Sequence, residues 1–312
     1  MTRRPAETTV AVLMGGWSAE REVSLSSGEG CANALRRAGF RVVPVDVQRQ
    51  TIVAVLQELK PDVAFNALHG KWGEDGCCAA ILETLGISYT HSGVLASSLA
   101  MHKEKSKAIF RAAGIPVAES QLVPLEMVAA GHPMAPPYVV KPVAEGSSVG
   151  VHIVLENANG PVQMVLEERA IFGAEAMVER FIPGRELTCA VIGDQPLGVI
   201  DIVSKSSSWY DYKAKYAPGG SQHILPADIP AEIYASCQAH ALAAHRALGC
   251  RGVSRADFRY DDRPGRGELI LLEVNTQPGM TGTSLVPELA AHAGRSYEDL
   301  VTWMVNDASV DR

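Results

Sequence analysis

Two acidic residues and one amide stand near the end of the chain at a spacing that suits metal binding. In the segment 269–281, LILLEVNTQPGMT, Glu273 and Asn275 lie two residues apart after an apolar run. Because side chains at i and i+2 of a strand share one face, both point the same way. A second strand-like segment, 253–258, adds Asp257 and a cation, Arg255. Two carboxylates and an amide oxygen favour Mg²⁺, which completes its coordination with phosphates and water, so the pattern predicts nucleotide chemistry.

The pair Glu273 and Asn275 also has a simpler interpretation. The two side chains could merely end a strand and open a polar turn, and for an isolated Glu-x-Asn that interpretation is the better one. Further ligand-like motifs in the same chain reverse the preference.

A glycine- and serine-rich segment, 145–150 (EGSSVG), separates two strand-like runs at 138–142 and 151–155. Small residues between paired strands let backbone N–H groups and hydroxyls approach phosphates closely. Lys141, at the end of the first run, would add a point charge. A hairpin tip that binds nothing is the alternative for such a segment taken alone.

Gly146, Ser148 and Gly150 also match the G-x-S-x-G nucleophile elbow of α/β hydrolases. That elbow requires a helix after the turn, whereas a β-rich run follows here. No acidic partner and histidine stand out in the expected later order, although four later histidines leave the alternative open: His223, His240, His245 and His292. The G-x-x-x-x-G-K-[ST] P-loop is absent from the sequence, so a nucleotide would be bound in another way.

Length and composition narrow the class of protein. A chain of 312 residues, 47% hydrophobic, exceeds what one core usually supports and predicts two or three domains. The net charge of −7 argues against nucleic acid as a partner, because phosphate backbones need a basic surface. Six cysteines without a C-x-x-C pair favour reduced thiols in the cytoplasm. The apolar run near the N-terminus is too short for a signal peptide or a membrane span, so no membrane association is expected.

Strand-like and helical segments alternate along the first third of the chain in the βαβ rhythm of an open parallel sheet. Ser18 is the expected N-cap of a helix that ends near Ala38. The other expected strands there are 10–14, 41–47, 62–68 and 87–90, and the other helices are 52–59 and 79–85. A second unit begins near Ser97 with a helix at 101–112, followed by strands at 138–142, 151–155 and 176–182.

The rest of the chain is predicted to mix strands with one long helix and a polar loop. The strands are 187–192 and 197–203, and helix 231–248 precedes the two strands of the metal site and a terminal helical segment. The loop, 204–226, is rich in aromatic residues and glycine, and about twenty unstructured residues inside a compact domain usually serve a function. We expect it to be a lid, and the domains to span 1–96, 97–182 and 183–312.

The hairpin, a lysine on each side of it (Lys103 and Lys141) and the late Asp…Glu-x-Asn pattern together resemble the ATP-grasp fold. Seven segments then look, in order, like those of the D-alanine–D-alanine ligase family: 15–24 (GGWSAEREVS), 68–70 (LHG), 73–76 (GEDG), 141–142 (KP), 145–150 (EGSSVG), 210–216 (YDYKAKY) and 275–281 (NTQPGMT). The resemblance spans nearly the whole chain. It implies a three-domain ATP-grasp fold, α/β and α+β in class, with a Rossmann-like N-terminal open parallel sheet.

The resemblance also implies ATP as a substrate and Mg²⁺ as the cofactor, with two ions bound and Mn²⁺ able to replace them. The metal ligands would be Asp257, Glu273 and Asn275. The implied ATP-binding residues are Lys103 and Lys141 at the α- and β-phosphates, Ser147 and Ser148 under the hairpin, Lys215 at the γ-phosphate, Glu186 at the ribose, and Glu179, Arg180, Phe181 and Ile182 at the adenine.

For the amino-acid substrates, Glu20 is implied to contact the ammonium of the first D-alanine. The alternative for Glu20 is that it stabilises the dipole of its own helix from the first turn. The alternative for His69 is a structural role, which is more common for a lone histidine at a strand end. Ser147 and Tyr216 are implied to hold Glu20 in position, and Val23 and His69 to lie beside the first substrate. Arg255 and the Gly279 N–H are implied to stabilise the oxyanion, and Ser284 and Leu285 to bind the second substrate.

The implied activity is ATP-dependent ligation of two D-alanine molecules through a D-alanyl phosphate, for peptidoglycan precursor synthesis, in a cytoplasmic homodimer formed through the N-terminal domain. Two alternatives remain open from the residues themselves. A noncatalytic binding module would have no need for Asp257, Glu273, Asn275 and both lysines together. Another ATP-grasp ligase would join a different carboxylate and amine.

Overall fold

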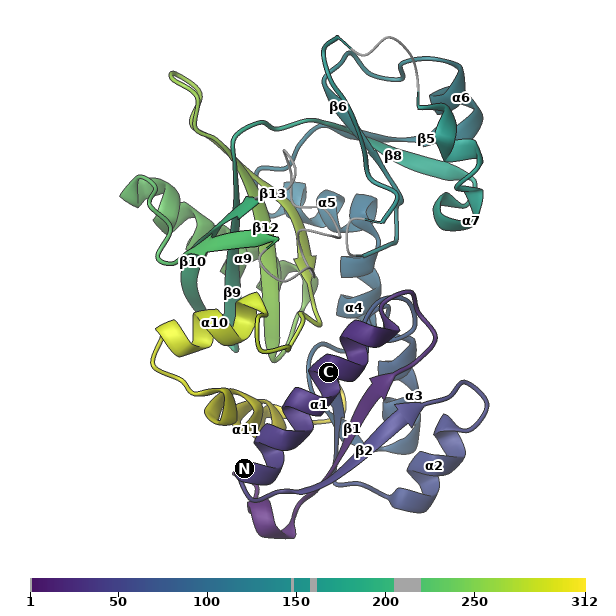
Figure 1. Ribbon diagram of the computed structural model, residues 1–312, viewed down its shortest axis with the longest axis vertical. Helices are drawn as coiled ribbons and strands as arrows, with labels where there is room; N and C mark the ends of the chain where they lie inside the picture. Colours follow the sequence, from purple (N-terminus) through teal and green to yellow (C-terminus); the bar gives the residue numbers. More distant parts are fainter. Residues whose placement is uncertain (1, 147–148, 158–161, 205–219) are drawn as a thin grey trace.

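Three sheets make up the framework of the protein. The computed structural model describes residues 2–146, 149–157, 162–204 and 220–312, and the short helix η1 (Pro5–Glu7) precedes the first strand. In chain order we refer to the N-terminal, central and C-terminal sheets. The N-terminal and central sheets lie towards opposite ends of the long axis, and the C-terminal sheet lies between them on one side (Figure 1).

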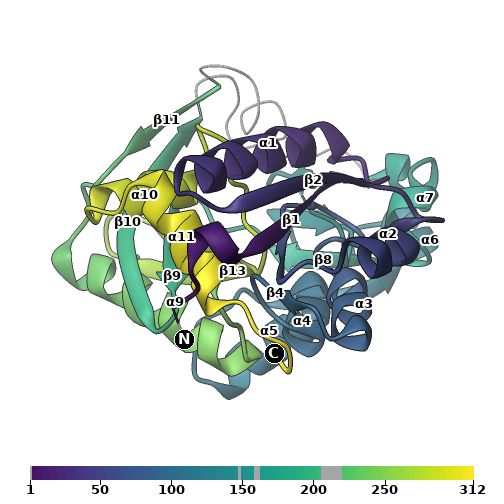
Figure 2. The same ribbon diagram turned by 90° about the horizontal axis from the view of Figure 1, so that it is seen from below.

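The N-terminal sheet is parallel throughout, in the order β2-β1-β3-β4, as the βαβ rhythm predicts. Its strands are β1 (Thr9–Gly15), β2 (Arg41–Val47), β3 (Val63–Asn66) and β4 (Ser88–Tyr89). Its helices are α1 (Arg21–Arg37), α2 (Ile52–Leu59) and α3 (Cys77–Leu85). Side chains of β1 alternate between two cores: Val10 and Val12 pack with α1, whereas Ala11 and Leu13 pack with α2 and α3. Helices therefore cover both faces (Figure 2).

Two helix boundaries differ from the predictions. Ser18 is not the N-cap of the first helix, because its hydroxyl donates to the His69 carbonyl at 2.6 Å, and Glu20 occupies the N-cap position. The single helix predicted over 101–112 is wrong at its start. Two helices, α4 (Val94–Met101) and α5 (Lys103–Ala112), meet at His102, whose extended backbone (φ −90°, ψ 92°) interrupts them.

The central sheet is antiparallel, in the order β5-β8-β6-β7. Its strands are β5 (Ser120–Pro124), β6 (Tyr138–Lys141), β7 (His152–Val154) and β8 (Glu175–Arg180), with α6 (Leu125–Ala130), η2 (Gln163–Leu166) and α7 (Arg169–Phe172) against them. The predicted hairpin is confirmed, because β6 and β7 pair across the glycine-rich segment. The edge strand β5 was missed, since its exposed side chains show little apolar alternation.

The C-terminal sheet is also antiparallel, in the order β11-β10-β9-β12-β13. Its strands are β9 (Arg185–Ile192), β10 (Gln195–Ser204), β11 (Ser221–Ile224), β12 (Val253–Asp261) and β13 (Glu268–Asn275), with helix α9 (Ala231–Leu248) against it. The predicted loop 204–226 is therefore wrong at its end, where β11 pairs with β10. Polar side chains in 221–223 conceal this strand, whose ladder bonds come from the backbone. Residues 205–219 lie outside the described part of the chain.

The last helices join the C-terminal sheet to the N-terminal one. Helix α10 (Leu285–His292) packs on β10, and α11 (Tyr297–Asp307) packs on α1 (Figure 2). Their buried side chains share one core with Val10 and Val12 of β1. This shared core fixes the end of β13 beside the carboxyl ends of β1 and β3, where the candidate site lies. Within the described ranges, no helix combines the length and apolar character needed to cross a membrane.

Candidate active site

The ladder between β12 and β13 brings the predicted metal-binding residues together. In its register Asp257 faces Glu273, and Arg255 faces Asn275. The two pairs lie two positions apart along each strand, so all four side chains share one face of the sheet, as the spacing predicts for Glu273 and Asn275. Glu273 and Asn275 line the same cavity.

The Asp257 carboxylate is saturated with donors. Arg255 binds it through two nitrogens, Nε to Oδ1 at 2.9 Å and Nη2 to Oδ2 at 2.8 Å. Thr188 Oγ1 donates to Oδ1 at 2.7 Å, and Asn275 Nδ2 donates to Oδ2 at 2.9 Å. Lys103 Nζ lies 3.4 Å from Glu273 Oε2. Protein cations thus hold both predicted carboxylate ligands, and the described residues include no cluster of three His, Cys, Asp or Glu side chains fit for a metal.

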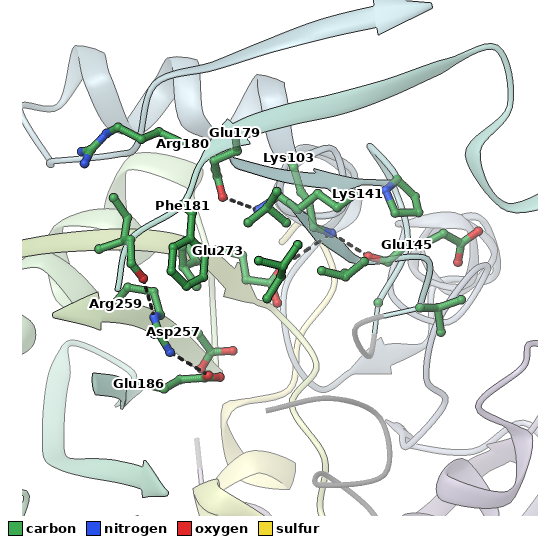
Figure 3. A pocket seen from close by; sticks show the side chains of 18 residues that line it. Lys103, Lys141, Glu145, Glu179, Arg180, Phe181, Glu186, Asp257, Arg259 and Glu273 are labelled. Carbon is green, nitrogen blue, oxygen red and sulfur yellow. Dashed lines mark hydrogen bonds and ion pairs between the residues drawn. The ribbon is translucent and has the colours of Figure 1, made fainter. Parts of the chain in front are cut away.

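A first cavity, the nucleotide cavity, opens between the central and C-terminal sheets (Figure 3). Apolar side chains form its walls, among them Val139, Ile153, Phe181 and Leu272. Lys103 and Lys141 lie near each other at one side of the cavity (Figure 3), so apolar walls beside two cations suit a flat ring joined to an anion. Every predicted ATP-binding residue in the described ranges lines it: Lys103, Lys141, Glu179, Arg180, Phe181, Ile182 and Glu186.

Glu179 lies buried between two lysines at the wall of the nucleotide cavity. Lys141 Nζ lies 2.7 Å from Glu179 Oε1, and Lys107 Nζ contacts Oε2. Burial lowers the pKa of Lys107 to about 8, while Glu179 opposes the change. The two lysines hold the pKa of Glu179 below its ordinary value although burial raises it. Sequence reasoning missed Lys107, which lies one helical turn after Lys103 on α5.

Arg259 is a second residue of this cavity that sequence reasoning missed. Its Nη1 lies 3.4 Å from Glu186 Oε2, and its Nε and Nη2 donate to the carbonyls of Ile182 and Gly184 at 3.1 and 2.7 Å. The guanidinium therefore fixes the link between β8 and β9. Its place two residues after Asp257, on the face already carrying Arg255, is the signal that could have identified it.

A second cavity, the amino-acid cavity, lies between the N-terminal and C-terminal sheets. Its volume of about 400 Å³ is in the range of small-molecule sites. Two of its lining residues, Gly146 and Glu273, also line the nucleotide cavity. The predicted substrate residues all line it: Glu20, Val23, His69, Arg255, Gly279, Ser284 and Leu285.

Glu20 approaches two glycine backbones closely. A Cβ atom on Gly70 would lie 2.8 Å from Glu20 Oε2, and one on Gly146 would lie 3.2 Å from it. Gly70 also has a φ of +72°, which other residues rarely adopt. The LHG motif therefore ends in glycine because the Glu20 carboxylate occupies the space of a side chain.

His69 is buried in the middle of a hydrogen-bonded chain that the sequence did not predict. Its Nδ1 lies 3.2 Å from Glu74 Oε1, and its Nε2 lies 2.9 Å from Ser27 Oγ. Ser27 Oγ in turn accepts from the Met280 N–H at 3.3 Å. The chain thus connects the histidine to the loop that carries Gly279.

The loop after β13 is held on both sides. Asn66 Nδ2 donates to Gln277 Oε1 at 2.6 Å, and Gln277 Nε2 donates to the Leu68 carbonyl. On the other side, Tyr297 Oη donates to the Met280 carbonyl at 2.5 Å. The Gly279 peptide is therefore fixed by residues of the N-terminal sheet and of α11. Asn66 and Tyr297 have no recognisable signal in the sequence.

Four predicted site residues lie outside the described part of the chain: Ser147, Ser148, Lys215 and Tyr216. Most of the predicted lid, residues 205–219, lies outside it as well.

Comparison with known proteins gives consistent results. The family model described as "D-ala D-ala ligase C-terminus" matches residues 109–306. A D-alanine–D-alanine ligase of Parvibaculum lavamentivorans is 64% identical over 97% of this chain and 98% of its own length. One from Methylorubrum populi is 60% identical over 97% of this chain and 99% of its own length.

Solved structures agree with these relatives. The crystal structure of D-alanine–D-alanine ligase from Bacillus anthracis complexed with ATP has a TM-score of 0.78 and 31% identity, covering 96% of each chain. The VanG D-Ala:D-Ser ligase from Enterococcus faecalis has a TM-score of 0.76 and 28% identity, covering 96% of this chain and 98% of that one.

Proposed function

Because this chain belongs to the D-alanine–D-alanine ligase family, we propose that its two adjoining cavities are where ATP and two D-alanine molecules react. The chain is an ATP-dependent ligase that forms D-alanyl-D-alanine for peptidoglycan synthesis. The residue roles that follow are proposals.

One observation supports the proposed roles above all others: Gly146 and Glu273 line both cavities. A nucleotide whose phosphates reach Glu273 would present its terminal phosphate at the mouth of the amino-acid cavity. A carboxylate held there would attack that phosphate without leaving the protein. Proximity of this kind is a major source of rate acceleration.

In the nucleotide cavity, the adenine would lie between the apolar walls beside Glu179, Arg180, Phe181 and Ile182. Glu186, which Arg259 holds in place, would accept hydrogen bonds from the ribose. Lys103 and Lys141 would bind the α- and β-phosphates, and both ammoniums are buried beside carboxylates that fix them. Ser147, Ser148 and Lys215 would complete the phosphate site from outside the described residues.

Asp257, Glu273 and Asn275 fit the donor set of a magnesium site, because three hard oxygen ligands share one face of adjacent strands. The same three residues would hold one or two Mg²⁺ ions, or Mn²⁺. When bound, the metal would neutralise phosphate charge as it develops. Arg255 is paired with Asp257 in this structure. If Asp257 bound a metal ion instead, Arg255 would be able to turn towards the amino-acid cavity.

The first step would be the attack of one D-alanine carboxylate on the γ-phosphorus. Glu20 would hold the ammonium of that D-alanine, and Val23 and His69 would border its side chain and backbone. The bond from the γ-phosphorus to the bridging oxygen would break, leaving ADP and D-alanyl phosphate. Lys103 and Lys141 would stabilise the charge that spreads over the phosphate oxygens.

The second step would be the attack of the second D-alanine's amine on the acyl carbon. Arg255 and the Gly279 N–H would stabilise the tetrahedral oxyanion. Ser284, the N-cap of α10, and Leu285 would receive the second carboxylate near free helix N–H groups. Phosphate would leave with one oxygen of the first carboxylate, and the amine would release its proton. Ser147 and Tyr216 would hold Glu20 throughout.

Several further properties are part of the proposal. The predicted loop 204–226, apart from strand β11, would form a lid over the acyl phosphate, which must be protected from water. The three domains would divide near residues 96 and 182. The protein would act in the cytoplasm as a homodimer joined through the N-terminal domain.

A substrate panel tests the proposed activity. ATP, Mg²⁺ and the protein are incubated with D-alanine, D-serine, D-lactate or L-alanine singly, and with D-alanine mixed with each of the other three. Phosphate and ligated product are measured. We expect phosphate and D-alanyl-D-alanine with D-alanine alone. A preferred D-alanyl-D-serine product, or phosphate release that depends on another amine, would assign the chain a different acceptor.

A further inference from the structure

Three charged side chains form a buried cluster behind the wall of the nucleotide cavity. The Lys107 side chain is 0% exposed and contacts one oxygen of Glu179, while Lys141 contacts the other at 2.7 Å. Two ammoniums thus share one carboxylate, and the cluster carries a net positive charge. Burying a charge is costly unless it has a partner of opposite charge. The second buried ammonium of this cluster therefore needs a physical reason.

Only part of this cluster faces the cavity. Glu179 and Lys141 line it, whereas Lys107 does not. Lys103 and Lys107 are four residues apart on α5, so both lie on the same face of that helix. Lys107 therefore reaches Glu179 from behind, and any effect it has on a ligand passes through that carboxylate.

The charge balance of the cavity shows what such an effect would be. Its described lining has four cationic and five anionic side chains, although its proposed ligand is a polyanion. Arg180 and Arg259 are paired with Glu268 and Glu186. Without Lys107, Glu179 would neutralise Lys141, and the other described cation towards the phosphates, Lys103, already lies 3.4 Å from Glu273.

We propose that Lys107 is a positioning residue for nucleotide binding: by sharing the Glu179 carboxylate, it keeps the charge of Lys141 available to a phosphate. This inference rests on the proposed nucleotide site and adds to it a residue that does not touch the ligand. The ligand class that benefits is nucleotides, whose phosphates Lys141 is proposed to bind, whereas a nucleoside without phosphate gains nothing.

The test compares ADP with adenosine in two lysine variants of the same helix. Lys107→Met removes the buried ammonium, and Lys105→Met removes an exposed one two residues away, as the matched control. Dissociation constants for ADP and for adenosine are measured by calorimetry or competition in Mg²⁺. We expect Lys107→Met to weaken ADP about tenfold, adenosine less than about twofold, and Lys105→Met to change neither.

A double variant separates charge from packing. In Lys107→Met/Glu179→Gln the carboxylate that captures Lys141 is gone, so the ratio of adenosine to ADP dissociation constants should return towards the wild-type ratio. If Lys107→Met fails to fold, Lys107→Gln replaces it with a neutral side chain able to donate to Glu179.

Equal losses for ADP and adenosine, unchanged ADP binding, or no recovery in the double variant would each overturn the inference. Failure of the proposed function is distinguishable, because it would appear in the wild-type protein as absent ADP binding or absent D-alanyl-D-alanine. If the wild-type protein binds ADP and forms D-alanyl-D-alanine but Lys107→Met leaves ADP binding unchanged, only this inference is overturned.

Discussion

The nucleotide cavity and the amino-acid cavity share Gly146 and Glu273, yet different contacts hold them in shape. Ion pairs fix the nucleotide cavity, and two of them join neighbouring antiparallel strands: Lys141 with Glu179 and Arg259 with Glu186. Hydrogen bonds between neutral groups hold the Gly279 loop of the amino-acid cavity, and they join residues far apart along the chain. Asn66 and Gln277 are 211 residues apart, and Ser27 and Met280 are 253 apart.

This difference has a consequence for catalysis. A change in the nucleotide cavity alters a charge that the surrounding sheet continues to hold in place. A change in the amino-acid cavity alters how the N-terminal sheet meets the loop of Gly279, and small displacements of reacting groups cost large factors in rate. Substitutions in the two cavities should therefore divide between ATP binding and the chemical steps.

The largest effect is expected at Glu273, where the cavities meet. Glu273→Gln keeps the shape but removes the charge proposed to bind the metal, so kcat should fall on the order of 10³-fold. Steady-state kinetics with D-alanine and saturating ATP measure it. A variant within tenfold of wild type would show that Glu273 is not part of the reacting centre.

A smaller effect is expected at Gly70 in the amino-acid cavity. Gly70→Ala places a methyl group 2.8 Å from Glu20 Oε2 in the undisturbed structure, so Glu20 must move. We expect kcat/KM for the first D-alanine to fall about 100-fold while KM for ATP is unchanged.

Gly86→Ala is the matched control for that variant. Gly86 has a similar positive φ of +65°, but a Cβ there meets nothing within 4 Å. It should reproduce the backbone strain and leave the kinetics near wild type. Equal kinetic losses in both variants would attribute the effect at Gly70 to strain rather than to Glu20.

Tyr297 tests the hydrogen bonds that hold the oxyanion loop. Tyr297→Phe removes the hydroxyl that donates to the Met280 carbonyl at 2.5 Å, so kcat should fall about tenfold with little change in KM for ATP. Tyr89→Phe, which removes a hydroxyl bonded to Glu83 at 2.7 Å, is the control. The account of the loop fails if the two variants have the same kcat.

The smallest effect is expected at Arg180. Its side chain points away from the cavity towards Glu268, 2.6 Å away, so the proposed adenine contact uses its backbone (Figure 3). Arg180→Ala should weaken ADP binding less than about threefold, because half-exposed ion pairs contribute little. A tenfold loss in an ADP titration would place the guanidinium at the nucleotide.

Much of the fold and of the charged site could be predicted from the sequence. The parallel sheet follows from apolar periodicity, and the shared face of Glu273 and Asn275 follows from their two-residue spacing along one strand. Both signals are local. The strand β11 was missed for the opposite reason, since its residues are polar and its pairing with β10 crosses a long connection.

The residues that sequence reasoning missed act across the tertiary structure. Ser27 on α1, Asn66 on β3 and Tyr297 on α11 meet the Gly279 loop only because the C-terminal part of the chain packs against the N-terminal sheet, which no local pattern encodes. Lys107 looks like an ordinary helix residue until the central sheet places Glu179 against it. Spacing reveals which groups share a face, whereas their partners depend on how the elements pack.

The central claim is that the two cavities pass one phosphoryl group from ATP to a D-alanine carboxylate. D-alanine labelled with ¹⁸O in both carboxyl oxygens, ligated with ATP, tests this directly through the mass of the released phosphate. An acyl phosphate intermediate transfers one labelled oxygen to each phosphate formed, which is the predicted result. Unlabelled phosphate beside labelled dipeptide would contradict the claim.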